Sequence, residues 1–285
     1  MSIINMTILL GTLTGILLVV GFLIGGFWGM TFALILSIVI NFVSYWYSDG
    51  IVLKMYKATP LDDPKIKEIV EDLAREAKIP TPRLYMINSD IPNAFATGRT
   101  PRRSAIAITH GLLQLNKDEL EGVLAHEISH ITNRDVLVGT LAATIAGAIA
   151  YLAQIGYWNM FFGGSGDRDE GGFLGLILII IFAPLAALLI RMAISRSREY
   201  KADYTGALIT RKPLALASAL RKIESVAVRH PVRGSSATAH MWIANPFKRD
   251  WFSNLFATHP AMSERIRRLQ EMDPKEILKR EKQGF

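Results

Sequence analysis

The sequence predicts a mainly α-helical protein with a small β-sheet, fused to about four transmembrane helices. Three observations support this fold class. Residues 1–48, 136–166 and 173–190 contain no charged side chain. The segments between and after these stretches are charged and show helix-like or strand-like periodicity. Half of the 285 residues are hydrophobic, which is high for a soluble chain of this length.

The first uncharged stretch, residues 1–48, predicts a hairpin of two membrane helices, because one crossing needs about 20 apolar residues. We expect a break near residues 25–29, GGFWG. A cleavable signal has a basic start, which this stretch lacks, so we interpret it as a permanent anchor with residues 45–47, YWY, in the interface. Residues 136–192 predict two further helices, although Pro184 leaves open an embedded hairpin that does not cross fully.

The distribution of lysine and arginine predicts the orientation in the cell membrane. Residues 49–135 hold twelve and residues 195–285 hold eighteen, whereas residues 162–172 hold one. The positive-inside rule therefore puts both soluble parts, 49–135 and 193–285, and both termini in the cytoplasm. This topology explains the net charge of +7, and no nucleic-acid-binding motif is present. We expect some of the basic residues also to face anionic lipid headgroups of the bilayer. The chain has no cysteine, which excludes disulfides and thiolate metal sites.

The segment 49–135 predicts the small sheet. Apolar residues at helical spacing indicate a helix over 66–77, and strands are expected at 83–87, 94–97 and 104–109. The turn at 98–103, GRTPRR, contains three arginines. A solvated hairpin turn and a contact with a lipid headgroup or a substrate both fit this turn.

A capped helix follows and carries a metal-type motif. Asn116 is a good N-cap, and Glu119 three residues later completes a capping box. The helix contains LAHEISHITNRD at 124–135, in which His126 and His130 stand four residues apart and share one face. Two imidazoles at this spacing can bind one zinc ion, and Glu127 beside them can act as a general base on water.

A catalytic zinc site needs a third protein ligand on the same side of the membrane. The two expected crossings between 136 and 192 return the chain to that side, where Glu199 and Asp203 stand four residues apart. One of these carboxylates can bind the metal, and the other can hold the second nitrogen of a histidine ligand.

Four segments together resemble the HtpX group of membrane zinc endopeptidases, to which the type I CAAX prenyl endopeptidases are distantly related. They are LAHEISHITNRD, NAFATG at 93–98, SREYKADYTGA at 197–207 and THPAMSERIRRL at 258–269. The resemblance implies an α+β zincin-type catalytic domain with one zinc ion. It implies that His126, His130 and Glu199 bind the metal, that Glu127 is the general base, and that Asp203 orients a ligand.

The resemblance also gives meaning to weaker features. It implies that His259 acts near the metal, as a donor to the developing oxyanion or as a fourth ligand, with Arg265 in support; a histidine that only packs is the other interpretation. It implies that a substrate peptide adds to the strand formed by Asn93, Ala94, Phe95 and Ala96. Residues 229–252 receive no role.

The predicted function is an endopeptidase that cleaves unfolded or misfolded membrane proteins on the cytoplasmic side, in quality control under stress. The resemblance implies overlap with an ATP-dependent membrane protease, whereas this chain has no phosphate-binding loop of its own. Two alternatives are a CAAX-type prenyl endopeptidase and a non-catalytic zinc-binding adaptor. The adaptor is disfavoured because closed structural zinc sites usually have four protein ligands, commonly cysteines. A transporter is disfavoured because the apolar segments lack charge.

Overall fold

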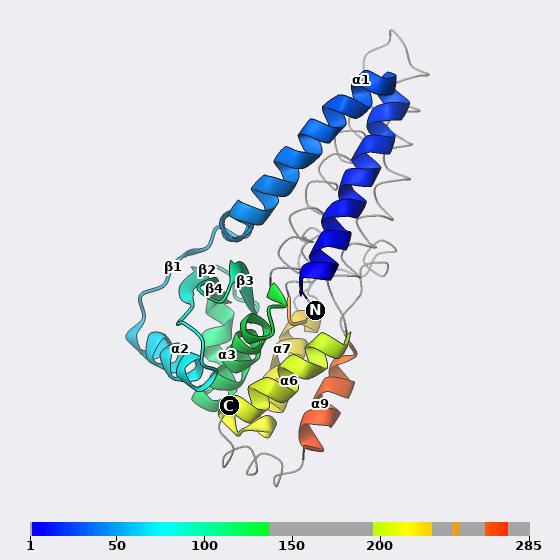
Figure 1. Cartoon of the computed structure of the whole chain (residues 1–285). Helices are drawn as coiled ribbons and strands as arrows, with labels where there is room; N and C mark the ends of the chain where they lie inside the picture. The colour runs from blue at the N-terminus through cyan, green and yellow to red at the C-terminus, as the bar shows by residue number, and fades with distance from the viewer. Residues whose placement is uncertain (1, 137–195, 230–241, 245–259, 273–285) are drawn as a thin grey trace.

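The computed structural model describes residues 2–136, 196–229, 242–244 and 260–272 (Figure 1). This part of the chain is mainly helical and contains a small sheet, as predicted. The sheet is mixed and has four strands, one more than expected, because residues 59–60 form β1. Its elements are α1 (Ser2–Met55), β1 (Thr59–Pro60), α2 (Pro64–Glu76), β2 (Arg83–Ile87), β3 (Ala94–Thr100), β4 (Arg103–Thr109), a 3₁₀ turn (His110–Gln114), α3 (Lys117–Thr132), α6 (Arg196–Thr210), α7 (Pro213–Arg229) and α9 (Met262–Gln270).

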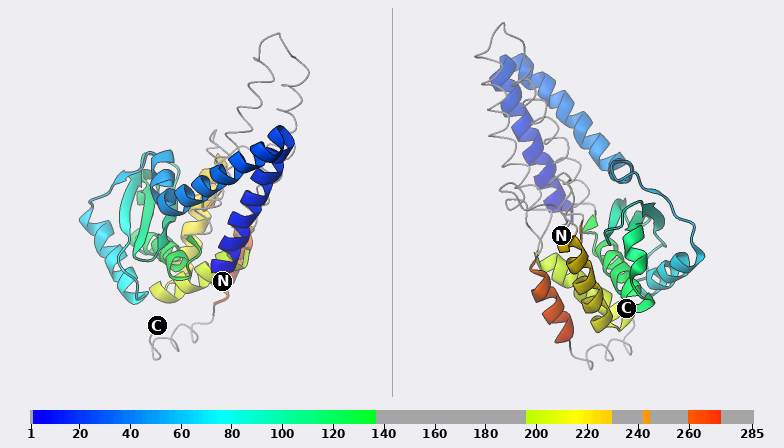
Figure 2. Two further views of the ribbon diagram at one scale, coloured as in Figure 1. Left: turned by 45° about the horizontal axis from the view of Figure 1, so that its top comes forward. Right: turned by 180° about the vertical axis from the view of Figure 1, so that it is seen from behind.

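Helix α1 is a hairpin with two limbs, which meet at the end farthest from the sheet (Figures 1 and 2). Gly26 has a φ of +56°, a left-handed conformation that glycine adopts at little cost, and it lies within the predicted break. Asn41 Nδ2 donates to Thr14 Oγ1 at 3.0 Å. On a straight helix these residues would be about 40 Å apart, so the contact requires antiparallel limbs.

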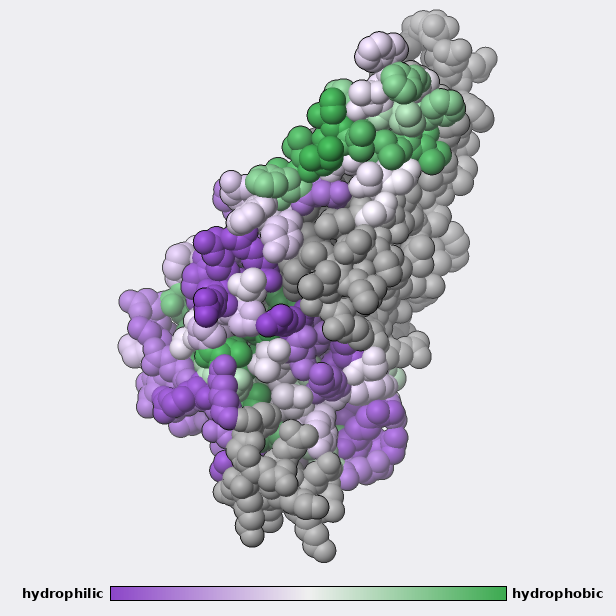
Figure 3. Space-filling model, viewed as in Figure 1, coloured by the Kyte–Doolittle hydropathy of each residue, from purple (hydrophilic) through white to green (hydrophobic). Residues whose placement is uncertain are grey.

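The second limb presents an apolar surface to solvent. Phe27, Trp28 and Phe32 are each at least 67% exposed, and a band of hydrophobic residues covers this limb (Figure 3). Residues 26–47, with a mean hydropathy of 1.9, form the one segment among the described residues that is long and apolar enough to cross a membrane. The two crossings expected within 136–192 lie outside the described residues.

The strands pair in the order β1-β2-β4-β3, with β2 parallel to β4 and the other pairs antiparallel. The three predicted strands are confirmed, but β3 and β4 extend farther into the turn between them. Gly98 permits this extension. Its φ is +130°, and a Cβ there would overlap the carbonyl oxygen of Arg103. Strand β3 therefore forms one edge of the sheet.

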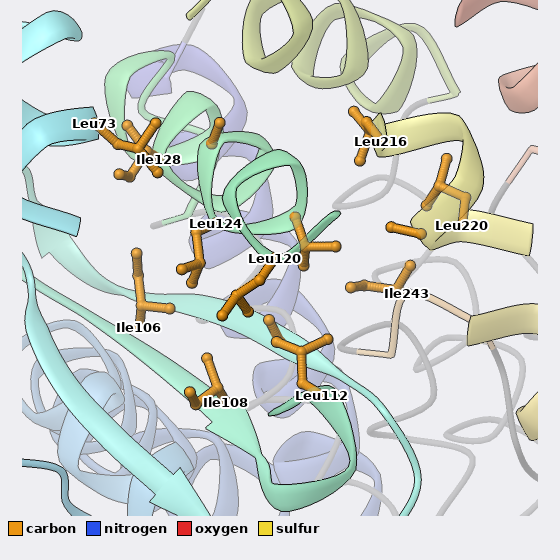
Figure 4. Packing of buried hydrophobic residues seen from close by; sticks show 14 of the residues in the cluster. Leu73, Ile106, Ile108, Leu112, Leu120, Leu124, Ile128, Leu216, Leu220 and Ile243 are labelled. Carbon is orange, nitrogen blue, oxygen red and sulfur yellow. The ribbon is translucent and has the colours of Figure 1, made fainter. Parts of the chain in front are cut away.

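Both faces of the sheet are buried. Ile106 and Ile108 on β4 face Leu120 and Leu124 of α3 in the main core (Figure 4). The alternate residues of β4 are alanines, and they pack with Phe95 beneath the last turns of α1. The end of α1 thus forms a third layer over the sheet, and β4 alternates large and small side chains to fit a helix on each face.

Helix α3 is the central helix of the fold, and α2, α6, α7 and β3 all pack against it. Its predicted capping box is present. Asn116 Oδ1 accepts from Glu119 N, and Glu119 Oε2 accepts from Asn116 N. Glu119 also accepts hydrogen bonds from Ser218 and Lys222 of α7. The same residue therefore caps α3 and links α3 to α7, a helix about a hundred positions later in the sequence.

Candidate functional site

The predicted metal ligands come together between α3 and α6. His126 and His130 present their Nε2 atoms to each other at 3.2 Å. Glu199 on α6 lies 3.9 Å from His126 Nε2 and 3.5 Å from His130 Nε2. Within the described part of the chain, these three residues form a cluster whose donor atoms all lie within 4.8 Å of one another.

The donor set fits zinc. Zinc binds nitrogen and oxygen ligands at about 2.0–2.1 Å, so two ligands at a tetrahedral angle are about 3.3 Å apart. The three observed separations of 3.2, 3.5 and 3.9 Å are close to this value. Two histidines and one carboxylate are also the donor set of several catalytic zinc sites, which leave a further position open.

A buried carboxylate and an arginine support His126. His126 Nδ1 lies 2.9 Å from Asp203 Oδ1, although the angle falls short of a regular hydrogen bond. Arg265 on α9 is 1% exposed and donates to both oxygens of Asp203 at 2.6 and 2.7 Å. Burial alone would raise the pKa of Asp203, but the charge and hydrogen bonds of Arg265, and then His126, lower it to about 2. Asp203 therefore stays ionised beside His126.

A second carboxylate, which the sequence analysis missed, lies behind His130. Asp135 Oδ2 is 3.6 Å from His130 Nδ1, longer than a regular hydrogen bond, and this buried oxygen has no hydrogen-bond partner among the described residues. Arg198 is buried one position before Glu199 and acts electrostatically on both Asp135 and Glu199. Asp135 is the last residue of the motif at 124–135. Its closeness to His130 in the sequence could therefore have marked it as a candidate site residue.

The site carries an excess of negative charge. Glu127, Asp135, Glu199 and Asp203 face two arginines, which gives a formal charge of minus two when all four acids are ionised. Burial alone would lower the pKa of His130, but Asp135, Glu199 and Glu127 outweigh burial and raise it to about 9. A divalent cation would balance this charge and would bind the histidines in their neutral form.

Glu127 faces the edge strand. Its Oε2 accepts a hydrogen bond of 2.8 Å from the backbone N–H of Ala96 on β3. The Glu127 side chain is buried, and burial raises its pKa, although the two histidines oppose the shift. The contact brings the candidate base within hydrogen-bonding reach of the predicted substrate strand.

The remaining predicted residues of that strand have structural contacts. Asn93 is buried, and its Oδ1 accepts from Ile243 N at 2.9 Å. Ala94 packs in the main core, and the ring of Phe95 lies 5.0 Å from that of Tyr56. Ala96 is the least buried of the four predicted residues. His259 lies outside the described residues.

A glycine permits the close approach of α6 to α3. A Cβ at Gly206 would lie 2.9 Å from His126 N and 3.1 Å from Ala125 C. Gly206 follows Glu199 by seven positions, and the two therefore share one face of α6. Gly206 was not predicted as a packing residue, although its helical spacing from Glu199 could be read from the sequence.

Comparisons with known proteins agree with this geometry. The model of peptidase family M48 matches residues 60–273, which include both the histidine motif and the helix of Glu199. The chain belongs to peptidase family M48. An M48 relative from Thermococcus sibiricus, "Protease HtpX homolog", is 53% identical over 274 residues, which is 93% of this chain and 94% of the relative. Another with the same name, from Persephonella marina, is 50% identical over 281 residues, 95% of this chain and 98% of the relative.

The resemblance to the HtpX group is thereby confirmed, and this M48 chain is a membrane metalloprotease of the HtpX type. A solved structure, "Crystal Structure of S. mikatae Ste24p", aligns with a TM-score of 0.50 and 20% identity. The alignment covers 91% of this chain and 62% of that chain, and it shows a shared fold.

Proposed function

We propose that this chain is a zinc-dependent endopeptidase that cleaves unfolded or misfolded membrane proteins at the cytoplasmic surface of the cell membrane, as part of a stress response. The observation that carries the proposal is the convergence of His126, His130 and Glu199, with Glu127 between this cluster and the edge strand. The relatives' name, protease, is consistent with it.

In the proposed site, the two histidines and Glu199 hold one zinc ion. Zinc, when bound, would supply Lewis-acid polarisation of the peptide carbonyl and activation of water. Asp203 and Arg265 fix the ring of His126. These groups hold the ligands in position before substrate arrives, so little reorganisation is needed during the reaction.

Glu127 acts as the general base and then as the general acid. It takes a proton from the attacking water and delivers it to the leaving amine. Burial raises the pKa of Glu127 above its usual value, which favours its holding the proton until the amine leaves.

The substrate adds to β3, which is an edge strand of the sheet formed by the described residues. Ala96 presents its N–H to Glu127 and is the most accessible of the four predicted residues. An extended peptide paired with β3 would lie alongside α3, with its backbone next to Glu127. Binding by strand addition uses hydrogen bonds to the peptide backbone and depends little on the side chains. It therefore suits unfolded substrates of varied sequence. His259 remains a candidate oxyanion donor from the sequence alone.

The test compares the detergent-purified parent with Glu127→Gln, which has nearly the same shape but cannot take a proton. We measure zinc per chain and cleavage of unfolded casein. The variant is expected to keep about one zinc per chain and to lose at least about 100-fold in cleavage rate, because general acid–base catalysis contributes about 10²–10⁴. His126→Ala is expected to lose both zinc and cleavage.

Cleavage by Glu127→Gln at the parent rate would contradict the assignment of Glu127 as the general base. A farnesylated peptide is included as a competing substrate. Its cleavage in strong preference to casein would contradict the proposed substrate class and favour a prenyl endopeptidase. Zinc bound by a parent that cleaves neither substrate would favour a non-catalytic adaptor.

A further inference from the structure

Four arginines near the end of β3 lack acidic partners among the residues that the structure describes. Arg99 lies near the end of β3, Arg102 lies in the turn that follows, Arg103 begins β4, and Arg134 follows α3. None of the four forms an ion pair within the described part of the chain. Some arginines on other surfaces differ. Arg75, Arg83 and Arg267 hold carboxylates at 2.6, 2.8 and 2.6 Å.

Arg99 is held in place by an aromatic ring rather than by a carboxylate. Its guanidinium carbon lies 3.9 Å from the ring centroid of Trp46 and 5.9 Å from that of Tyr45. Its Nη1 is buried and has no hydrogen-bond acceptor among the described residues. A cation–π contact fixes the plane of the group but satisfies none of its N–H donors. A buried donor without an acceptor is costly, so an anion that accepted from Arg99 would stabilise the site.

The location points to lipid as the source of that anion. Trp46 and Tyr45 lie near the end of the exposed apolar limb of α1, and tryptophan and tyrosine gather at the headgroup level of a bilayer. Asp49, three positions beyond Trp46, is the first charged residue of the chain and pairs with Arg83. Arg99 therefore lies at the depth where the apolar surface gives way to the polar one.

Arg134 completes the site from another element. Arg99 and Arg134 line the same hollow, together with Gly98, Ser104, Ile131 and Val136. Val136 is the first residue of the uncharged stretch 136–166, so the hollow lies where the chain leaves its polar part. Arg102 and Arg103 are exposed in the adjoining turn. The hollow thus combines two cations from distant segments with a polar hydroxyl and small apolar walls.

We propose that Arg99 and Arg134, with Arg102 and Arg103 beside them, bind the phosphate of an anionic membrane lipid. Guanidinium groups match phosphate oxygens in geometry, and Trp46 orients one of them in advance. The bound lipid would fix the end of β3 at the headgroup level. Ala96, which contacts Glu127, lies three positions from Arg99 on the same strand. Lipid binding would therefore set the depth of the substrate strand relative to the bilayer.

The test uses the full-length, delipidated protein in neutral detergent. We titrate short-chain phosphatidylglycerol, phosphatidylcholine of the same chain length, and inorganic phosphate, and follow the midpoint of thermal unfolding. Phosphatidylglycerol is expected to raise the midpoint with saturation, and the other two are not. Arg99→Gln is expected to weaken the apparent affinity about fivefold, and Arg99→Gln with Arg134→Gln about 25-fold.

Arg75→Gln is the matched control. It makes the same change of charge at an exposed arginine on α2 that is paired with Asp72, and it is expected to keep the parent affinity. Zinc content and the unfolding midpoint without lipid report whether each variant is folded. If Arg99→Gln fails to fold, Arg134→Gln tests the site alone, since this side chain is exposed.

Three results would overturn the proposal. Equal stabilisation by phosphatidylcholine would mean that only the apolar surface responds to lipid. Equal stabilisation by inorganic phosphate would make the site a binding site for free phosphate. Unchanged phosphatidylglycerol affinity in the folded double variant would show that Arg99 and Arg134 do not bind the lipid.

Discussion

At the candidate centre, a carboxylate lies behind each histidine, and an arginine lies behind each carboxylate. Each histidine has a carboxylate on its Nδ1 side, and an arginine acts on each carboxylate. These carboxylates and arginines hold the two histidine rings in an orientation in which their Nε2 atoms converge. Orienting carboxylates of this kind raise the basicity of histidine ligands and fix their tautomer. Asp135 has the same relation to His130 as Asp203 has to His126, although at a longer distance.

Substitution of Asp135 tests this relation. Asp135→Asn is expected to weaken zinc binding about 10- to 100-fold, because the imidazole of His130 loses its orienting charge. Competition with a chelator of known affinity measures the change independently of cleavage. Asp72→Asn, at an exposed carboxylate on α2, is the control and is expected to match the parent. Unchanged zinc affinity in Asp135→Asn would limit Asp135 to a packing role.

At the scale of elements, the site depends on how closely α6 packs against α3. The two histidines share a face of α3 because of their spacing, but only the position of α6 brings Glu199 to them. The contact at Gly206 sets this position, because a methyl group there would meet the backbone of His126. The candidate third ligand is thus positioned by a residue about two turns away, which contacts the backbone of His126 rather than the metal-binding side chains.

Gly206→Ala is expected to destabilise the protein by about 1–3 kcal/mol, as overpacking in a close-packed interior does. It is also expected to weaken zinc binding, since α6 must move away from His126. Thermal unfolding and chelator competition measure the two effects. Gly50→Ala is the control, because no atom lies within 4 Å of an added Cβ there. Parent-like values for Gly206→Ala would show that the interface can relax without cost.

The start of α3 gives a prediction for pH. Burial alone would raise the pKa of Glu119, but hydrogen bonds from Lys222, Ser218 and the backbone of Asn116 lower it below its ordinary value of 4.5. A carboxylate with a lowered pKa stabilises the fold above its unfolded pKa, and this contribution is lost as the pH falls through the folded pKa. Glu119→Gln should therefore unfold at a lower temperature than the parent at pH 7.

The difference in unfolding temperature between parent and Glu119→Gln should shrink as the pH falls below about 4.5. Melting curves from pH 7 to pH 3 measure it. Glu76→Gln, at a half-exposed carboxylate that is 3.6 Å from Arg211, serves as the control. A difference that stays constant with pH would show that Glu119 acts by shape rather than by charge.

At the scale of the whole molecule, the apolar hairpin and the catalytic part form one structure. The last turns of α1 cover the sheet through Val52 and Leu53, so the anchor continues directly into the core. The limb that leads to them carries the exposed apolar band (Figure 3). The distance of the site from the bilayer is therefore set by a continuous helix rather than by a flexible linker.

The absence of cysteine makes the membrane topology directly testable. Single substitutions Ser2→Cys, Gly50→Cys and Lys201→Cys are expected to react with an impermeant maleimide only after the cytoplasmic side is exposed. Trp28→Cys and Ser165→Cys are expected to react from the outside. Right-side-out and inverted vesicles measure the two sides, and the cysteine-free parent is the control. Labelling of Ser165→Cys from the cytoplasmic side would contradict a fourfold crossing.

The sequence by itself determined the features that depend on near neighbours. The capping box of α3, the shared face of His126 and His130, the bounds of β2 and the turn at Gly26 all follow from residues a few positions apart. The uncharged stretches were equally clear, because the hydrophobic effect acts on composition alone. The argument that the chain returns to the same side of the membrane made Glu199 and Asp203 candidates, and the resemblance to the HtpX group then selected Glu199 as the ligand.

Only the tertiary structure decided which distant groups meet. Arg265 reaches Asp203 across 62 positions, and Arg99 lies over Trp46 of a different element. Asp135 turns back to His130 just after the helix ends, where Arg134 takes a φ of +59°. No periodicity encodes such contacts, because they depend on how closely helices pack and on which backbone atoms a single glycine lets them approach. The sequence therefore indicated the candidate ligands, and packing brought their donor atoms within 4.8 Å of one another.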